Sequence, residues 1–352
     1  MEKTAVMIGM SGGVDSSAAA LLLKENGMAC AGATMVLFGE GDCRDAKIIA
    51  SQLEIPHHVL DCREEFQQIV IRNFVESYEQ GLTPNPCILC NQTLKFGLML
   101  EKARLMGFSH VATGHYAKIS RDPVSGRYLL KKAADPAKDQ TYFLYSLSQD
   151  QLAHTLFPLG DLRKEEIRLL AEENGLITAH KRDSQDICFI PDGDYVSFLR
   201  RFTGKTYPAG DYLDLSGKVI GTHSGSVCYT VGQRRGLGIA LGQPAYVIRK
   251  DAVHNTVTLG PNEALLSPGL LADHMNWILP YEKDTPIPCS GKIRHSQTEQ
   301  PATLYPQADG SCIAVFQEPQ RAVSPGQAAV FYQGDTVICG GTIRSALKKE
   351  EL

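Results

Sequence analysis

SGGVDSS at residues 11–17 is the stretch that decides the fold of this chain. An apolar run at 5–10 precedes it, and an alanine- and leucine-rich run at 18–23 follows it. That order predicts a strand, a tight glycine turn and a helix. Paired glycines let successive backbone N–H groups point at one spot, and serines of this kind cap helices. The stretch therefore predicts an anion-binding loop at the N-terminus of a helix.

Strands and helices are expected to alternate on both sides of this loop. Strands are expected at 5–10, 29–38, 57–61 and 109–114, and helices at 18–25, 42–53, 64–80, 91–106, 162–174 and 193–202. Alternation of this kind predicts an α/β fold with a doubly wound parallel sheet. Ligands of such sheets bind beyond the carboxyl ends of the strands, where loop 11–17, Met35 and Gly114 are expected.

The length and texture of the chain predict further domains. Its 352 residues exceed the ~250–300 at which a single core stops growing. From Gly204 onward glycines are frequent and the helical periodicity is absent, and residues 251–277 are interpreted as a mixed connector. Short β-like runs after 292, separated by turn signals, predict a small barrel or sandwich. We expect an α/β domain at 1–203, a small central domain at 204–270 and a C-terminal β-barrel at 271–352.

Composition and charge limit the possible settings. The longest apolar-rich run, 28–38, is shorter than the ~20 residues that span a bilayer. Residues 1–5 lack a signal-peptide layout. We therefore expect a cytoplasmic protein that does not associate with a membrane. The net charge of −4 argues against a broadly positive surface. Basic pairs at 131–132, 163–164, 181–182, 200–201 and 234–235 are each interpreted as solvated charge that could jointly track phosphates.

Two distant segments carry the cysteines that suggest chemistry. The first, TPNPCILCN at 83–91, contains Cys87 and Cys90 on what its two prolines predict to be a constrained loop. Cys90 is expected just before a helix start, where the positive end of the dipole favours the thiolate. A free thiol with a pKa of about 8.5 is only a few per cent ionised at pH 7, so such help matters. The second, DSQDICFI at 183–190, contains Cys188.

The same motifs resemble known families. SGGVDSS resembles the PP-loop of the ATP pyrophosphatases, which grips the pyrophosphate half of ATP. The pair NPCILCN at 85–91 and DICFI at 186–190 is similar to the signature of the bacterial tRNA 2-thiouridylases, which place sulfur on the wobble uridine. Further matching segments lie at 113–117, 138–144, 229–238 and 324–332, so the resemblance covers nearly the whole chain. It implies a PP-loop domain, a small central domain and a C-terminal β-barrel.

The resemblance also implies roles for individual residues. Cys90 would be the nucleophile, Cys188 the persulfide carrier, and residues 85–87 would face the target base as Asn85, Pro86 and Cys87. The implied ATP site consists of Gly9, Met10, Ser11, Gly12, Gly13, Val14, Asp15, Ser16, Met35 and Gly114. The implied tRNA contacts are His115, Lys138, Asp139, Gln140, Arg294, His295 and Gln327.

The implied reaction uses ATP with Mg²⁺ to adenylate the uracil C2 oxygen, which is otherwise a poor leaving group. A persulfide on Cys188, loaded by a cysteine desulfurase or a sulfur-relay protein, would then supply sulfur. Cys90 would reduce that persulfide or resolve the intermediate, and both routes leave a Cys90–Cys188 disulfide. Such a bond requires Cα atoms within about 7 Å.

Two departures from the family pattern leave alternatives open. Cys87 stands where the family usually has aspartate, so Cys87, Cys90 and Cys188 could instead hold a [4Fe-4S] cluster with one open iron. The stretch after Met35 is short and lacks the acidic insertion of relatives.

A PP-loop ligase acting on a small metabolite is a further alternative, although it needs a glutaminase or ammonia channel that the sequence does not show. A non-catalytic nucleotide- or RNA-binding protein is the third.

Overall fold

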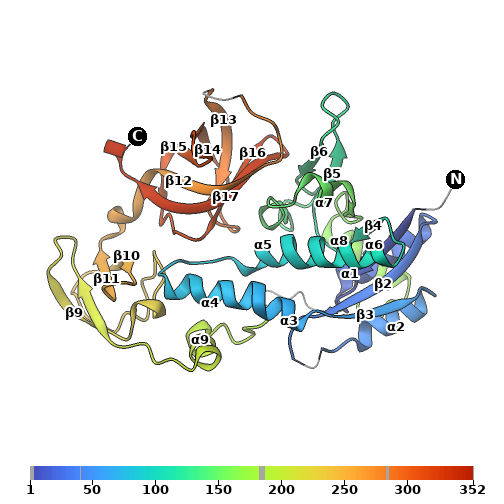
Figure 1. Cartoon of the computed structure of the whole chain (residues 1–352), viewed down its shortest axis with the longest axis horizontal. Helices are drawn as coiled ribbons and strands as arrows, with labels where there is room; N and C mark the ends of the chain where they lie inside the picture. The colour runs from blue at the N-terminus through green and yellow to red at the C-terminus, as the bar shows by residue number, and fades with distance from the viewer. Residues whose placement is uncertain (1–3, 40, 182–186, 283–284, 352) are drawn as a thin grey trace.

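The computed structural model in Figure 1 describes residues 4–39, 41–181, 187–282 and 285–351. An α/β unit comes first along the chain, a small β-rich unit follows, and a barrel made largely of the last strands completes the molecule. The predicted order of a parallel-sheet domain, a small central domain and a C-terminal barrel is therefore confirmed. Among the described residues, no helix has both the length and the apolar character needed to cross a membrane.

The first unit is built on a five-stranded sheet in the order β3-β2-β1-β4-β7, with every pairing parallel. Its strands are β1 Ala5–Gly9, β2 Ala29–Val36, β3 His57–Asp61, β4 His110–Ala112 and β7 Thr155–Leu156. The chain leaves β1 for β2 on one side, and β4 lies on the other side of β1. The loop after β1 therefore lies at the switch point where such sheets bind ligands.

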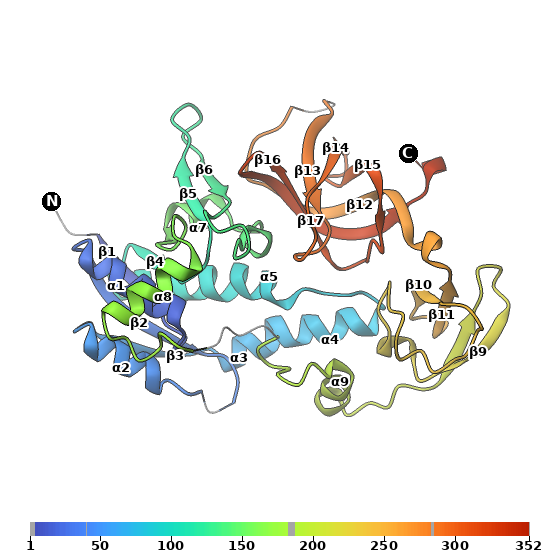
Figure 2. The same ribbon diagram turned by 180° about the vertical axis from the view of Figure 1, so that it is seen from behind.

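Alternate residues of β1 face opposite layers of helices, as the period of a strand requires. Val6 and Ile8 pack with α1 (Val14–Glu25) and α2 (Arg44–Gln52). Met7 packs on the other face with α6 (Met99–Leu105). Seen from behind, α1 and α8 (Lys164–Glu173) lie side by side over the sheet (Figure 2). Both faces of the sheet are thus covered, which is why its central strand is wholly apolar.

Two longer helical segments extend from the sheet toward the other units. One joins α3 Arg63–Glu65, the π-helix η1 Phe66–Ile71 and α4 Arg72–Glu79. The other joins α5 Pro86–Cys90, the π-helix η2 Asn91–Leu98 and α6. Four short elements complete this unit and its links, namely η3 Thr141–Phe143, α7 Gln149–Ala153, β5 Lys118–Arg121 and β6 Tyr128–Lys131.

The central unit follows α9 (Tyr195–Thr203) and forms a four-stranded sheet in the order β10-β11-β8-β9. Its elements are β8 Gly210–Leu213, β9 Val219–His223, η4 Ser226–Cys228, β10 Tyr246–Asp251 and β11 Thr256–Gly260. A short helix, η5 Asn262–Leu265, leads on to the barrel.

Six strands form the barrel, which is closed by the pairing of β12 with β17. They are β12 Leu266–Trp277, β13 Ile287–Lys292, β14 Gln300–Pro306, β15 Cys312–Arg321, β16 Ala328–Gln333 and β17 Thr336–Leu347, with η6 Lys349–Glu351 after them. Residues 251–277, expected to be a connector, instead contain β11 and the first barrel strand. The β5–β6 hairpin of the first unit extends the barrel sheet through β17.

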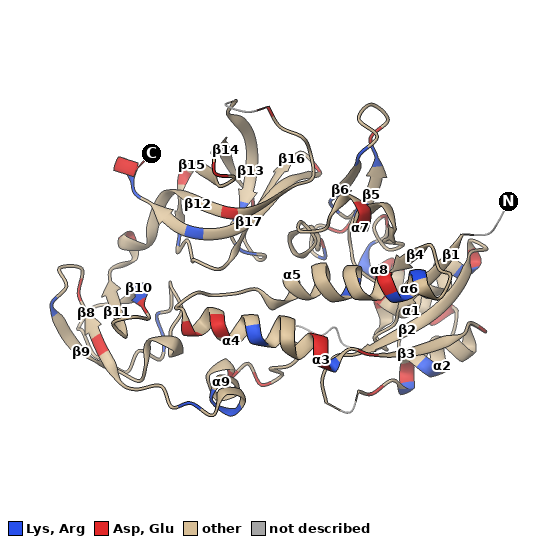
Figure 3. Cartoon of the chain, in the orientation of Figure 1, with Lys and Arg blue, Asp and Glu red and all other residues tan. Residues whose placement is uncertain are grey.

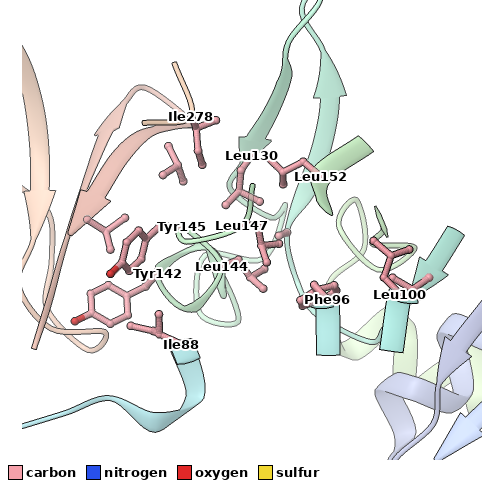
Figure 4. Close-up of a cluster of buried hydrophobic side chains, with 14 of the residues drawn as sticks. Ile88, Phe96, Leu100, Leu130, Tyr142, Leu144, Tyr145, Leu147, Leu152 and Ile278 are labelled. Atoms are coloured by element: carbon pink, nitrogen blue, oxygen red, sulfur yellow. The ribbon is translucent and has the colours of Figure 1, made fainter. Parts of the chain in front are cut away.

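A shared core joins the barrel to the α/β unit (Figure 4). The Tyr142 hydroxyl donates a 2.9 Å hydrogen bond to the Ala328 carbonyl of β16. The Asn276 side chain of β12 donates to the Tyr145 carbonyl at 2.6 Å. Apolar side chains from η2, β6 and the barrel pack around these tyrosines, so the two units are held by one continuous interior.

Candidate active site

The glycine loop between β1 and α1 is held in shape by its own serines. Gly12 has φ +74°, a conformation that glycine adopts without strain. The Ser16 hydroxyl accepts a 3.2 Å hydrogen bond from the Ser11 N–H and donates to the Gly13 carbonyl at 3.1 Å. The Ser17 hydroxyl donates to the same carbonyl at 2.9 Å. The expected tight turn into a helix N-terminus is present, with Gly13 as the residue before the first helical turn.

Residues expected to bind ATP meet at one edge of the sheet. Gly9 ends β1, Met35 is the penultimate residue of β2, and Gly114 follows β4. A Cβ atom at Gly114 would lie 2.6 Å from the carbonyl carbon of Asp15, so only glycine lets the β4 end approach the first turn of α1 this closely. The structure thus gathers the expected set, namely Gly9, Met10, Ser11, Gly12, Gly13, Val14, Asp15, Ser16, Met35 and Gly114.

Two lysines of the expected solvated pairs instead contact this loop. Lys164, the first residue of α8, is buried and donates from Nζ to both carboxylate oxygens of Asp15, at 2.7 and 2.8 Å. Lys181 donates from Nζ to the Gly12 carbonyl at 3.0 Å and also pairs with Asp45. The interpretation as solvated charge is wrong for Lys164, which is buried, whereas the Lys181 side chain remains 48% exposed. The contacts of both lysines are with segments distant in the sequence, which a local pattern does not reveal.

The cysteine segment 83–91 contains a helix rather than the expected loop. Helix α5 begins at Pro86, and the Asn85 side chain caps it by accepting a 3.2 Å hydrogen bond from the Cys87 N–H. Proline suits the first helical position, since its missing N–H is not needed there. Cys87 therefore lies in the first turn, and Cys90 lies inside the helix rather than just before its start. The dipole argument made for Cys90 does not hold.

Apolar packing brings the two cysteine segments together. Cys90 is buried in a cluster that also contains Phe189 and Ile190, the neighbours of Cys188. The Phe189 ring packs edge-on against Phe74 at 5.3 Å between centroids. Cys188 itself is exposed, as is Cys87, and all three thiols are free.

The pKa values of these thiols are raised instead of lowered. Partial burial of its thiol, and then the nearby Cys90 and Cys87, raise the pKa of Cys188 to about 11. Burial also raises the pKa of Cys90 and of Cys87. The three thiols are therefore close enough to act on one another electrostatically. The Lys95 ammonium opposes all three shifts, and the sequence reasoning missed this lysine.

Metal binding finds no support in the side chains that the structure describes. Within those ranges, no group of three or more His, Cys, Asp or Glu residues is arranged to hold a metal ion. In the described structure Cys87, Cys90 and Cys188 are thus not arranged as a ligand set for an iron–sulfur cluster.

Most residues expected to contact tRNA are engaged within the protein. The ring of His115 packs against Phe96, and burial lowers the pKa of His115 well below its usual value. The Gln140 side chain accepts from the Tyr116 N–H at 2.9 Å, and Asp139 accepts from the Ala133 N–H at 3.0 Å. Lys138 lies just before them, half-buried in the same turn.

The three expected tRNA contacts in the barrel also bind protein atoms. Arg294 donates to the Ala322 carbonyl and to the Ser324 hydroxyl, each at 3.0 Å. His295 stacks near Phe143, with 4.4 Å between ring centroids. Gln327 donates to the Thr83 carbonyl at 2.9 Å, just before the Cys90 helix. These residues hold the barrel, the α/β unit and the cysteine segment together.

The surface carries both signs of charge. Figure 3 shows Lys, Arg, Asp and Glu residues interspersed on α2 and α4 instead of separated by sign. The sequences RDAKIIASQ and RNFVESYE of these helices agree with that view.

A parallel sheet with a glycine loop at its switch point places the first unit among the doubly wound α/β folds, and comparison with family models assigns it to the HUP-domain class. The chain matches the profile described as tRNA methyl transferase HUP domain over residues 4–192. It matches the tRNA methyl transferase PRC-barrel domain over 196–261 and the aminomethyltransferase beta-barrel domain over 267–343.

The chain belongs to the family of tRNA-specific 2-thiouridylases. It is 49% identical to the tRNA-specific 2-thiouridylase MnmA of Geotalea uraniireducens (strain Rf4), over 97% of this chain and 95% of that protein. It is 47% identical to the protein of the same name from Acetivibrio thermocellus, over 98% and 100% of the two chains. The Treponema denticola protein of that name is 47% identical, over 97% and 98%.

Proposed function

We propose that this chain catalyses ATP-dependent 2-thiolation of the wobble uridine of tRNA. The observation that carries the proposal is the apolar cluster that joins the Cys90 helix to the Cys188 segment, because sulfur transfer needs two thiols in one place. The family to which the chain belongs and the glycine loop at the switch point give the proposal its substrate and its energy source. A small-metabolite ligase would not need the paired cysteines.

The first chemical step uses the glycine loop. Its N–H groups and the N-terminus of α1 suit the phosphates of ATP, and Mg²⁺ would enter with the nucleotide, bound mainly by phosphate oxygens and water. The uracil C2 oxygen attacks the α-phosphate and releases pyrophosphate. The oxygen then leaves C2 as part of AMP, which is a far better leaving group than oxide or hydroxide.

The second step delivers sulfur. The Cys90 thiolate attacks Sγ of the Cys188 persulfide, forming the Cys90–Cys188 disulfide and releasing hydrosulfide. Hydrosulfide adds to the activated C2, AMP departs, and loss of the remaining S–H proton leaves the thiocarbonyl. Alternatively the persulfide sulfur itself attacks C2, and Cys90 then cleaves the sulfur–sulfur bond. In both routes a reductant must reopen the disulfide, and a cysteine desulfurase or relay protein reloads the exposed Cys188.

The remaining assignments complete the proposal. Asn85, Pro86 and Cys87 at the helix start would face the target base. His115, Lys138, Asp139, Gln140, Arg294, His295 and Gln327 would shape the tRNA surface, several of them by ordering the segments that touch it. We place the action of the three units together, with bounds 1–203, 204–270 and 271–352. The proposed location is the cytoplasm, where tRNA and ATP are both present.

The test is reconstitution with unmodified tRNA, ATP–Mg²⁺, cysteine and a cysteine desulfurase. Wild type should form 2-thiouridine, detected by mass spectrometry of digested tRNA, and one AMP for each sulfur inserted. Cys90→Ser and Cys188→Ser should lose at least a hundredfold of the thiolation rate. Cys30→Ser, a half-buried thiol at the opposite end of β2, is the matched control and should retain activity.

Two outcomes would contradict the proposal. One is 2-thiouridine formed at the normal rate by Cys90→Ser, and the other is AMP formation that depends on a small metabolite and not on tRNA. The cluster alternative is separated by anaerobic purification with iron and sulfide assays. We expect no stoichiometric iron, and a visible absorption band near 400 nm that is lost in Cys87→Ala would replace the persulfide mechanism with the cluster.

A further inference from the structure

The Asp15 carboxylate of the glycine loop is fully engaged by two residues outside the loop. Its Oδ1 accepts a 2.6 Å hydrogen bond from the Tyr116 hydroxyl and a 2.7 Å bond from Lys164 Nζ, and its Oδ2 accepts from the same ammonium at 2.8 Å. The Lys164 side chain is 10% exposed and Tyr116 is 2% exposed. The Asp15 side chain is 29% exposed, so the ion pair beside the first turn of α1 is buried on the side of its two partners and open to solvent at the carboxylate.

Three elements converge to make this contact. Tyr116 lies two residues after Gly114, whose lack of a side chain lets the β4 end reach α1. Lys164 begins α8, and its backbone N–H is fixed by the Asp135 carboxylate at 3.1 Å. The Lys164 ammonium also lies 5.8 Å from the centre of the Tyr116 ring. The contact of Asp15 with Tyr116 and Lys164 therefore depends on segments that are distant in the sequence, and the glycine loop alone cannot form it.

The charge of Asp15 poses a problem for a loop that binds phosphates. A carboxylate in the first turn of a helix satisfies the same positive dipole end that a phosphate would use. At distances of a few ångströms in a partly buried site, an uncompensated carboxylate would repel a triphosphate strongly. An ammonium bonded to both of its oxygens cancels that charge and holds the carboxylate to one side.

We infer that Lys164 and Tyr116 are positioning residues that hold and neutralise Asp15, and thereby set the affinity of the glycine loop for ATP. The inference rests on the proposed function, since it takes ATP as the ligand of the loop. It gives the pair a role in nucleotide binding that is separate from the thiol chemistry, because neither residue belongs to the cluster around Cys90.

The experiment measures equilibrium binding of α,β-methylene ATP, which cannot be cleaved at the reacting bond, to the full chain without tRNA. Lys164→Met should weaken binding at least tenfold, because it leaves Asp15 unpaired. Lys164→Arg should stay within about threefold of wild type. Tyr116→Phe should weaken binding about threefold. Lys24→Met, which removes an exposed partner of Glu54 at the other end of α1, is the matched control and should bind as wild type does.

A double variant separates charge cancellation from general damage to the fold. Asp15→Asn with Lys164→Met removes both charges, so it should regain most of the affinity lost in Lys164→Met alone. In steady-state assays, Lys164→Met should raise the KM for ATP while the KM for tRNA stays within twofold. Thermal melts of each variant report folding, and Lys164→Arg and Tyr116→Phe still test the inference should Lys164→Met melt early.

Each outcome decides between the inference and the proposed function. Unchanged affinity in a folded Lys164→Met, or a double variant no tighter than Lys164→Met, would overturn the inference and leave the proposed function intact. Unchanged affinity in Tyr116→Phe would remove Tyr116 from it. A wild-type chain that does not bind the analogue would instead overturn ATP use at the loop, and with it the proposed function.

Discussion

At the scale of single residues, the reactive thiols lie in surroundings that keep them protonated. Burial is the largest cause of the raised pKa of Cys90 and of Cys188. The group that opposes it is Lys95, one helical turn beyond Cys90 in η2. An ammonium stabilises a thiolate, so Lys95 favours the reactive form of both thiols.

Replacement of Lys95 by methionine should therefore raise the pKa of the Cys90 thiol further. Below the pKa, each tenfold loss of thiolate slows alkylation tenfold, so we expect iodoacetamide to label Cys90 roughly three- to tenfold more slowly at pH 8. The profile of labelling rate against pH should move to higher pH. Peptide mass spectrometry measures both.

Lys102→Met is the control for that experiment. Lys102 lowers the pKa of Cys62, so its removal should act on that buried thiol and leave the labelling of Cys90 unchanged. A Lys95→Met protein whose Cys90 profile matches wild type would show that Lys95 has no such role.

Sequence reasoning found the residues of the site but not their environment. Cys90, Cys188 and the glycine loop were identified because their motifs are local and contiguous. Lys95, Lys164 and Tyr116 were missed or misread, because a lysine on a helix is ordinarily solvated and only the tertiary structure shows which charges meet. The expected low pKa of Cys90 was wrong for the same reason, since burial cannot be read from its neighbours in sequence.

At the scale of elements, the parallel strands were predicted well and the start of the reactive helix was not. β1 and β2 are largely apolar runs, which predict buried strands, whereas β3 is the mixed sequence HHVLD and was expected from its position after Pro56. The two prolines of segment 83–91 predict a constrained loop, whereas in the structure Pro86 starts α5 and Asn85 caps it. β7 has two residues, too few to leave a pattern, and the π-helical turns of η1 and η2 have no sequence signal.

The cap at Asn85 gives a prediction for this helix. Asn85→Ala removes the acceptor of the Cys87 N–H and should lower the free energy of unfolding by about 1 kcal/mol. Asn85→Asp retains an acceptor and should lie close to wild type in stability. Urea unfolding monitored by circular dichroism measures the difference, and an alanine variant as stable as the aspartate variant would contradict the capping role.

At the scale of the whole molecule, the barrel and the α/β unit behave as one body because their cores merge. The texture of the sequence predicted both units but not their union. The residues responsible are separated by more than a hundred positions, as with Tyr145 and Gly340. A Cβ atom at Gly340 would lie 2.4 Å from the Tyr145 ring. Strand β17 can therefore lie this close to the α/β unit only because residue 340 is glycine.

Gly340→Ala tests this union. Forcing a methyl group against the Tyr145 ring should lower the stability of the chain by about 1–3 kcal/mol. Loss of stability should appear together in the barrel and in the α/β unit, measured by hydrogen exchange of strands from both. Gly310→Ser, at a turn with open space around it, is a control for changes confined to the barrel, although its positive φ will cost some stability of its own. Protection lost from the barrel strands alone would contradict a merged core.

The contact of the barrel with the segment before α5 has a consequence for inheritance. The Thr83 N–H donates to the Pro325 carbonyl at 2.8 Å, and a Cβ atom at Gly326 would lie 2.8 Å from the Thr83 nitrogen. Any side chain at Gly326 must therefore displace the chain that leads into the Cys90 helix. Alleles that replace Gly326, in the last quarter of the gene, would then have the same phenotype as the loss of a reactive cysteine, although Cys90 and Cys188 are both still present.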